Sequence, residues 1–287
     1  MNGEDRNSES LNIAPDNLGT LYVVATPIGH LDDLTRRAEY VLKQVQIIAA
    51  EDTRRTGRLL AHIGHTAPQL ISLHDHNEEQ QSERLLQALQ RGQDVALVSD
   101  AGTPLINDPG FNLVKLAQAG GVRSVPIPGC SSVIAALSVC PLPCQKFTYL
   151  GFVPAKPKAR KDMLGQALQL PTALVLFETP HRILHTLELL HTLTSRRLML
   201  ARELTKQHES LYVGTAQEVS DALGPNPKGE MVLVLEAAEP SGVSMDEQHV
   251  LSVLLKDLSP SQAARIGANL LGVKRQELYA RAQELAR

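Results

Sequence analysis

The chain has 287 residues, 43% hydrophobic and 21% charged, a composition typical of a soluble globular protein with room for about two domains. Its net charge of −3 excludes a global basic field, so any nucleic-acid contact depends on a local patch. Tryptophan is absent, which argues against an aromatic platform for single-stranded bases. The three cysteines form no CxxC pair, and no apolar run reaches the roughly 18 residues of a membrane helix. We therefore expect a reduced, cytoplasmic protein without a membrane segment.

Residues 1–18 are polar, lack the apolar core of a signal peptide, and are predicted to form a flexible tail. The segment 19–140 then alternates short apolar strands with helices, which predicts an α/β domain with a largely parallel sheet covered on both faces. The first of these helices is expected to begin near Asp32 and Asp33. The strands are expected at 21–25, 45–50, 69–73, 94–99 and 122–128.

A second α/β domain is predicted over 141–238, with strands at 172–178, 196–201, 210–214 and 229–237. Thr179 and Pro180 have the order that opens a helix, and Thr215 with Glu218 has the spacing of a capping box. Fewer helices separate these strands than in the first domain. The sheet of this domain is therefore expected to be mixed.

The composition changes again over 239–287, where a linker leads to three predicted helices. Ser259 and Pro260 are expected to start the middle one, and Gly272 to end it. A helix, a glycine turn and a Lys-Arg helix start resemble a helix-turn-helix motif. A small helical appendage packed on the body explains the same pattern equally well, and both interpretations stay open.

Polar and small residues follow every apolar strand of the first domain. Because the carboxyl ends of parallel strands share one rim, these residues predict a polar crevice for a small charged ligand. The loop after the fourth strand also carries two carboxylates, Asp100 and Asp108. The segments concerned are 26–30, 51–54, 74–78, 99–104 and 128–132.

Several standard site signatures are missing from the sequence. No GxGxxG follows the first strand and no GxxxxGK[ST] occurs, which argues against dinucleotide and P-loop binding. His74 and His76 alternate with Asp75, but no third metal ligand is placed by the sequence, so no metal is expected. Ser131 lacks the GxSxG context of a hydrolase nucleophile.

Nine ordered segments carry a resemblance that extends from about Leu21 to the C-terminus. The chain resembles the ribosomal RNA small subunit methyltransferase I group of the tetrapyrrole methylase superfamily. His30 and Cys130 depart from the pattern of that group. The segments are TPIGHLDDLT, AAEDTRRTGRLL, LHDHNE, VALVSDAGTPLINDPG, PIPGCSSVIAAL, GFVPAK, FETPHRI, ARELTK and GEMVLVLE.

The resemblance implies a two-domain α/β fold with a helical extension, with S-adenosylmethionine bound in the cleft between the domains. It also implies a homodimer and 2′-O-methylation of a cytidine ribose in the decoding region of 16S rRNA, as free rRNA or in the small ribosomal subunit. The positions that match the cofactor contacts of the superfamily are Pro27, Asp100, Thr103, Ile106, Ser131, Ser132, Phe177, Leu204 and Met231. Glycine and proline in the loop after the fourth strand suit close backbone approach to such a ligand.

A ribose hydroxyl is a poor nucleophile, so we expect a base or charge stabiliser near it. From their places at strand ends, Asp100 is expected near the cofactor, with Glu178 and Lys206 near the acceptor. Glu51 and Asp52 are further candidates on the rim. The alternative interpretation is an ion-pair network that fixes the domain interface, formed by Glu178, Arg182, Arg202 and Glu203.

Three basic clusters could contact RNA phosphates, although a solvated helix face explains such runs as well. They are Lys156, Lys158, Arg160 and Lys161; Arg54, Arg55 and Arg58; and Lys274 with Arg275. The nearest rival function keeps the cofactor but methylates a tetrapyrrole. A rival of a different class is a helix-turn-helix DNA-binding regulator with an α/β ligand sensor.

Overall fold

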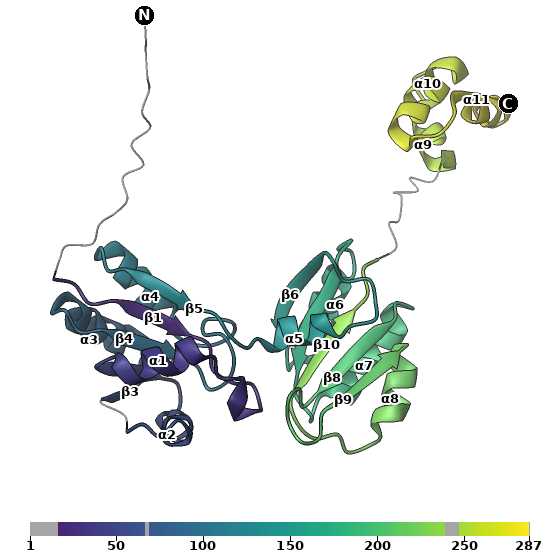
Figure 1. Cartoon of the computed structure of the whole chain (residues 1–287). Helices are drawn as coiled ribbons and strands as arrows, with labels where there is room; N and C mark the ends of the chain where they lie inside the picture. Colours follow the sequence, from purple (N-terminus) through teal and green to yellow (C-terminus); the bar gives the residue numbers. More distant parts are fainter. Residues whose placement is uncertain (1–16, 67–68, 239–246, 287) are drawn as a thin grey trace, which may run out of the picture. The chain divides into compact units, whose positions relative to one another are not determined.

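The computed structural model describes residues 17–66, 69–238 and 247–286. Contacts divide the chain into two units, one reaching to Ala237 and one starting at Ala238. The first unit contains two five-stranded sheets, and the second contains helices (Figure 1). Most of the predicted tail and the linker at 239–246 lie outside the described residues.

The first sheet is parallel throughout, as predicted, with the strand order β3-β2-β4-β1-β5. This order places β4 between β1 and β2, so the loops after these three strands meet at one edge. The strands are β1 (Leu21–Val24), β2 (Ile47–Ala50), β3 (Leu70–Ser72), β4 (Val95–Val98) and β5 (Ser124–Ile127).

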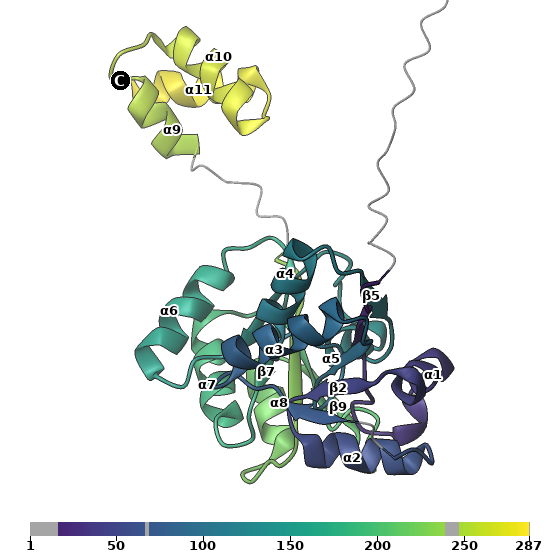
Figure 2. The ribbon, with the colours of Figure 1, turned by 90° about the vertical axis from the view of Figure 1, so that its left-hand side faces the viewer.

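Helices cover both faces of the first sheet, which confirms the predicted double cover (Figure 2). On one face, Leu85 and Leu113 pack against Ile47 and Leu97; on the other, Leu42 and Leu60 pack against Ile48. Burying these side chains is the main stabilising term of the layer. The helices are α1 (Arg36–Gln44), α2 (Thr53–His62), α3 (Glu78–Gln90) and α4 (Phe111–Ala119).

The second sheet is mixed, as predicted, with the order β6-β7-β10-β8-β9. β6 pairs in parallel with β7, whereas the other neighbours are antiparallel. The sequence did not predict β6 or α6, the helix that follows it. The elements are β6 (Phe147–Phe152), α6 (Pro157–Ala167), β7 (Ala173–Glu178), α7 (Ile183–Leu193), β8 (Leu198–Arg202), β9 (Ser210–Gly214), α8 (Ala216–Leu223) and β10 (Met231–Leu235).

Alternate residues of the second sheet pack into two different cores. Leu233 of β10 packs with Leu187 of α7, whereas Val232 and Val234 pack with Ala136 of α5 (Ser132–Ser138). Figure 1 shows α5 beside β10. The chain position of α5 precedes residue 140, where the domain boundary was predicted, yet this helix contributes to the core of the second sheet.

Two helices begin later than predicted. A short 3-10 helix (Leu31–Asp33), capped by His30, comes first, and α1 starts only after Thr35, whose hydroxyl accepts a hydrogen bond from the Ala38 amide. Likewise Thr179 and Pro180 do not open α7, which begins at Ile183. The intervening turn is held by Glu178, which accepts hydrogen bonds from both Thr179 and Arg182. The capping box of Thr215 and Glu218 is confirmed.

The second unit has a small apolar core around Leu251, Ala264 and Leu278. Ser259 caps the middle helix and Gly272, with φ +67°, ends it, as predicted. The helices are α9 (Glu247–Leu254), α10 (Pro260–Leu271) and α11 (Arg275–Leu285). Within the described parts of both units, no helix has the length and apolar character needed to cross a membrane.

Candidate active site

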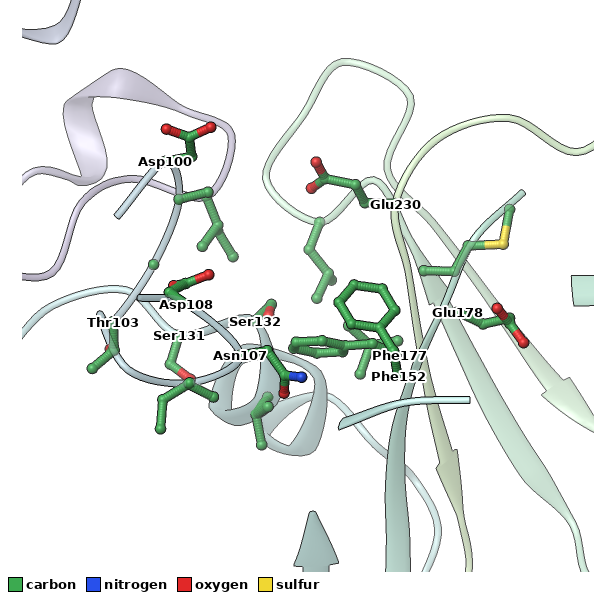
Figure 3. A pocket seen from close by; sticks show the side chains of 18 of the residues that line it. Asp100, Thr103, Asn107, Asp108, Ser131, Ser132, Phe152, Phe177, Glu178 and Glu230 are labelled. Carbon is green, nitrogen blue, oxygen red and sulfur yellow. The ribbon is translucent and has the colours of Figure 1, made fainter. Parts of the chain in front are cut away.

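A cavity of about 400 Å³ lies where the strand ends of the two sheets face each other (Figure 3). Its walls come from the loops after β1, β2, β4 and β5 and from one edge of the second sheet. The lining residues are Ile28, Glu51, Arg55, Asp100–Thr103, Ile106–Asp108, Ser131–Val133, Phe152, Phe177–Pro180, Ala201, Leu204 and Glu230–Val232. A volume of this order suits a small molecule.

The structure brings together at this cavity all the residues predicted to contact the cofactor except Pro27. Pro27 lies between Thr26, which pairs with Gly102, and Ile28, which lines the cavity. Pro27 therefore belongs to the loop after β1 but does not itself line the cavity. Of the three predicted catalytic residues, Asp100 and Glu178 line the cavity and Lys206 does not.

The loop after β4 is shaped by its backbone. Thr26 and Gly102 exchange two main-chain hydrogen bonds, of 2.9 and 3.0 Å, which tie the loop to the end of β1. Gly102 has φ +86°, a conformation that L side chains rarely adopt. The Thr103 hydroxyl donates to the carbonyl of Cys130 at 3.0 Å and thereby joins this loop to the one after β5. The loop thus presents main-chain groups to the cavity in a fixed arrangement.

A second irregular loop, after β8, approaches from the other sheet. Glu203 and Thr205 have positive φ, and the Thr205 hydroxyl accepts a hydrogen bond from the His30 amide at 3.2 Å. A Cβ at Gly29 would lie 2.5 Å from this hydroxyl and 2.6 Å from the Lys206 side chain. The glycine of the TPIG segment therefore permits close contact between loops of the two sheets.

Lys206 is held by two carboxylates. Its ammonium lies 3.0 Å from Glu203 and 3.1 Å from Glu230. Partial burial alone would lower the pKa of Lys206, but the hydrogen bonds to these carboxylates outweigh it and raise the pKa above its usual value. Lys206 is consequently a fixed cation and not a proton acceptor at neutral pH.

Glu178 is fully buried and its carboxylate is already occupied. It accepts hydrogen bonds from Thr186 at 2.6 Å and from the Thr179 amide at 2.8 Å, and pairs with Arg182 at 2.9 Å. In Figure 3 its carboxylate points away from Asp100. This arrangement favours the alternative interpretation of Glu178 as part of an ion pair.

The predicted network of Glu178, Arg182, Arg202 and Glu203 forms only in part. Glu178 pairs with Arg182, whereas Arg202 donates to the Lys228 carbonyl and Glu203 pairs with Lys206.

Three carboxylates of the first sheet's loops line the same wall: Glu51, Asp100 and Asp108. Asp100 lies 3.3 Å from Arg55 and accepts the Asp52 amide at 2.9 Å. Burial, then the charge of Asp100, raises the pKa of Glu51. Burial, then the charge of Glu51, raises the pKa of Asp108 to about 7. Sequence reasoning noted Asp108 as a loop carboxylate and missed it as a site residue; its only signal was its place in the same loop as Asp100.

An aromatic wall faces these carboxylates from the second sheet. The Phe177 ring lies 5.2 Å from that of Tyr149 and 5.3 Å from that of Phe152. Tyr149 donates its hydroxyl proton to the side-chain oxygen of Asn107, which lies in the loop after β4. Phe152 and Asn107 were missed in the sequence because neither β6 nor the contact between the loops was predicted.

The predicted basic clusters differ in what their members contact. Arg160 is buried and donates to the carbonyls of Pro154 and Ala155, so it supports the start of α6. Lys156, Lys158 and Lys161, on the same segment, are exposed. In the cluster of α2, Arg54 pairs with Asp52 and Arg55 with Asp100, whereas Arg58 is exposed. Across the described residues, no group of three His, Cys, Asp or Glu side chains could hold a metal ion.

This fold and cavity define a class, the tetrapyrrole methylases. The model of the family described as Tetrapyrrole (Corrin/Porphyrin) Methylases matches residues 20–220. Among solved structures, the methyltransferase CobJ matches with a TM-score of 0.58 and 18% identity, covering 77% of this chain and 95% of that one. Diphthine synthase matches with a TM-score of 0.57 and 16% identity, covering 76% and 90%.

Curated relatives define the group within that class. Ribosomal RNA small subunit methyltransferase I of Escherichia coli O157:H7 is 46% identical over 278 residues, covering 94% of this chain and 97% of the relative. The protein of the same name from Synechocystis sp. is 44% identical, covering 93% and 99%. Residues 241–286 match the model described as RsmI C-terminal HTH domain. The chain belongs to the ribosomal RNA small subunit methyltransferase I family.

Proposed function

We propose that the chain transfers a methyl group from S-adenosylmethionine to the ribose 2′-hydroxyl of a cytidine in the decoding region of 16S rRNA. The observation that carries this proposal is 46% identity, over 94% of the chain, to a relative named for methylation of the small-subunit rRNA. The finer assignment, to a cytidine ribose, rests on the sequence resemblance. We further propose that the protein acts in the cytoplasm as a homodimer.

The cavity has the chemistry that this cofactor requires. Its aromatic and aliphatic wall, with Phe177 and Met231, suits the adenosine portion, and the Asp100 carboxylate suits the cationic portion. In this proposal the main chain around Gly102 and the Thr103 hydroxyl contact the part of the cofactor that joins its adenosine portion to its cationic portion. When bound, the cofactor supplies a methyl group activated on a positively charged sulfur.

In this proposal the chain's main contribution is alignment. Two hydrogen bonds join the two walls, one from His30 after β1 to Thr205 after β8 and one from Tyr149 of β6 to Asn107 after β4, and they hold the walls at a fixed separation. Holding the reacting atoms in line lowers the barrier by several kcal/mol, on the order of 7 or more in well-oriented intramolecular reactions. Asp100 is proposed to orient the cofactor, with Lys206 fixing the loop of the facing wall.

Glu178 was predicted near the acceptor, and we now propose a structural role for it. Its carboxylate is buried and bonded on all sides, so no oxygen is free for the substrate. Ionic contacts of this kind position the turn that carries Thr179 and Pro180 at the cavity.

A transfer assay tests the function. The purified protein and labelled S-adenosylmethionine are incubated with small ribosomal subunits or with uroporphyrinogen III, and modified RNA is mapped by mass spectrometry. We expect one methylated cytidine ribose in 16S rRNA and no label on the tetrapyrrole. Label on uroporphyrinogen alone would contradict the proposal and favour the rival tetrapyrrole activity.

We also propose that the exposed lysines at 156, 158 and 161, just beyond Phe152, contact RNA phosphates. Changing all three to glutamine is expected to weaken rRNA binding, because each neutralised phosphate releases counterions. The slope of log affinity against log salt should become less steep by about 2 if all three contribute. Binding is measured by filter retention at several salt concentrations.

The matched control for these lysines is the double variant Lys115→Gln, Lys146→Gln, which removes exposed charge outside the cavity lining. Its salt slope should remain close to that of the unmodified protein. Equal slopes for the triple variant and the unmodified protein would contradict the assignment of this surface.

A further inference from the structure

One carboxylate of the cavity, that of Asp108, has no role in the proposal above. Asp108 lies in the loop between β4 and α4 and lines the cavity. Figure 3 shows it between Asp100 and Asn107, on the wall that faces the aromatic side chains of the second sheet. Two features of its environment bear on its chemistry: the backbone around it is held on both sides, and it has no ion pair among the described residues, whereas Asp100 pairs with Arg55.

The backbone on each side of Asp108 is fixed. Asn107 has φ +68°, and its side-chain oxygen accepts the Tyr149 hydroxyl of β6. On the other side, the Gly110 amide donates to the Glu78 carboxylate at 2.9 Å. Asp108 is therefore held within narrow limits before any ligand binds, as a reacting group requires.

The charged groups around Asp108 are almost all acidic. Burial raises its pKa most, the charges of Glu51 after β2, Asp100 after β4 and Asp75 after β3 raise it further, and a hydrogen bond with Ser99 offsets part of the rise. The nearby cation, Arg55 of α2, pairs with Asp100, and no ion pair to Asp108 occurs within the described part of the chain. On the β6 side, burial and then the charge of Asp108 raise the pKa of Tyr149 to about 12, so Tyr149 stays protonated. Asp108 is thus the carboxylate of this wall best suited to take up a proton near neutral pH.

We propose that Asp108 accepts the proton that the acceptor hydroxyl loses during methyl transfer, an inference that rests on the proposed function. A lone pair of the hydroxyl oxygen forms the new bond to the methyl carbon. The bond from that carbon to sulfur breaks, and its electron pair remains on sulfur. The electron pair of the O–H bond stays on oxygen, and the proton moves to the Asp108 carboxylate.

A base with a pKa near the working pH is sufficient for this step. The hydroxyl oxygen gains positive charge as its bond to carbon forms, so its proton becomes strongly acidic only late in the reaction. Asp100 is less suited to the task, because Arg55 and the Asp52 amide already contact its oxygens. Glu51 acts on this step through Asp108, because its charge adds to the effect of burial in raising the proton affinity of Asp108.

The test compares Asp108→Asn, Glu51→Gln and Asp100→Asn in the full-length protein, with methyl transfer to small ribosomal subunits measured across pH. In the unmodified protein, kcat/KM should rise as pH increases through about 7, because the base acts only when deprotonated. Asp108→Asn should lower kcat/KM by about 10²–10⁴-fold and remove that inflection. Glu51→Gln should move the inflection to lower pH, whereas Asp100→Asn should retain an inflection controlled by Asp108.

Two further measurements, of carboxyl protonation and of cofactor affinity, test the role of Asp108 without relying on methyl transfer. Infrared difference spectra of the protein alone, between about pH 6 and about pH 8, should contain a protonated carboxyl band that Asp108→Asn lacks. Calorimetry should find equal affinity for S-adenosylmethionine in Asp108→Asn and the unmodified protein. An inflection or carboxyl band that persists in Asp108→Asn, or lost cofactor binding, would overturn the role of Asp108. Absence of cofactor binding or rRNA methylation in the unmodified protein would instead overturn the proposed function.

Discussion

Replacing Glu178 with alanine is expected to lower the free energy of unfolding by about 3–5 kcal/mol, because the partly buried Arg182 guanidinium loses its carboxylate partner and the buried Thr186 hydroxyl loses its acceptor. Of its side-chain contacts among the described residues, Arg182 retains only the hydrogen bond to the Thr179 hydroxyl in this variant. For a unit of this size the melting temperature should fall by about 6–20 °C. Differential scanning calorimetry measures the change directly.

Glu188→Ala is the matched control for Glu178. Glu188 lies on α7 with 81% of its side chain exposed, and its loss should change stability by less than about 0.5 kcal/mol. If Glu178→Ala melted like the unmodified protein but lost methyl transfer, the catalytic role first predicted for Glu178 would replace the structural one.

Gly110→Ala is the second change with a large expected effect. Gly110 caps the start of α4 with φ +122°, and an added Cβ would lie 2.6 Å from the buried Leu97 side chain. Backbone strain and overpacking together should cost about 3 kcal/mol. The shift should also displace Asp108, two residues earlier, so methyl transfer should fall along with the melting temperature.

Gly121→Ala separates the two causes. Gly121 follows the same helix with φ +71°, but no atom lies within 4 Å of the added Cβ. Only the backbone cost, about 1–2 kcal/mol, applies there. Equal losses of stability at the two glycines would indicate that the contact with Leu97 contributes nothing.

The parallel sheet and the rim that carries the site could be predicted from the sequence because both depend on local patterns. Short apolar runs such as Val95–Val98 end in polar residues, and parallel pairing gathers those ends at one edge. The same reasoning placed Asp100, Thr103 and Ser131 at the cavity. Beyond this, assignment of the individual cofactor positions depended on the family resemblance.

Features that depend on contacts between distant segments could not be predicted. β6 has neither a continuous apolar run nor a regular alternation, since its buried residue Gly151 has no side chain. α5 follows the first sheet in the chain but packs on the second, which only the folded arrangement decides. The proton affinity of Asp108 likewise results from burial and from Glu51, 57 positions earlier in the chain. Spacing along the sequence carries none of this information.

The charges inside and outside the cavity are expected to act differently on the phosphate and the sugar of a nucleotide. Glu51, Asp100 and Asp108 outnumber Arg55 inside, whereas exposed lysines lie on α6 and the segment before it. A phosphodiester is repelled by the interior and attracted to the outer lysines. An RNA strand is therefore expected to keep its backbone at the surface and to present a sugar edge inward, so that the distribution of charge favours the face of the polymer that meets the methyl donor.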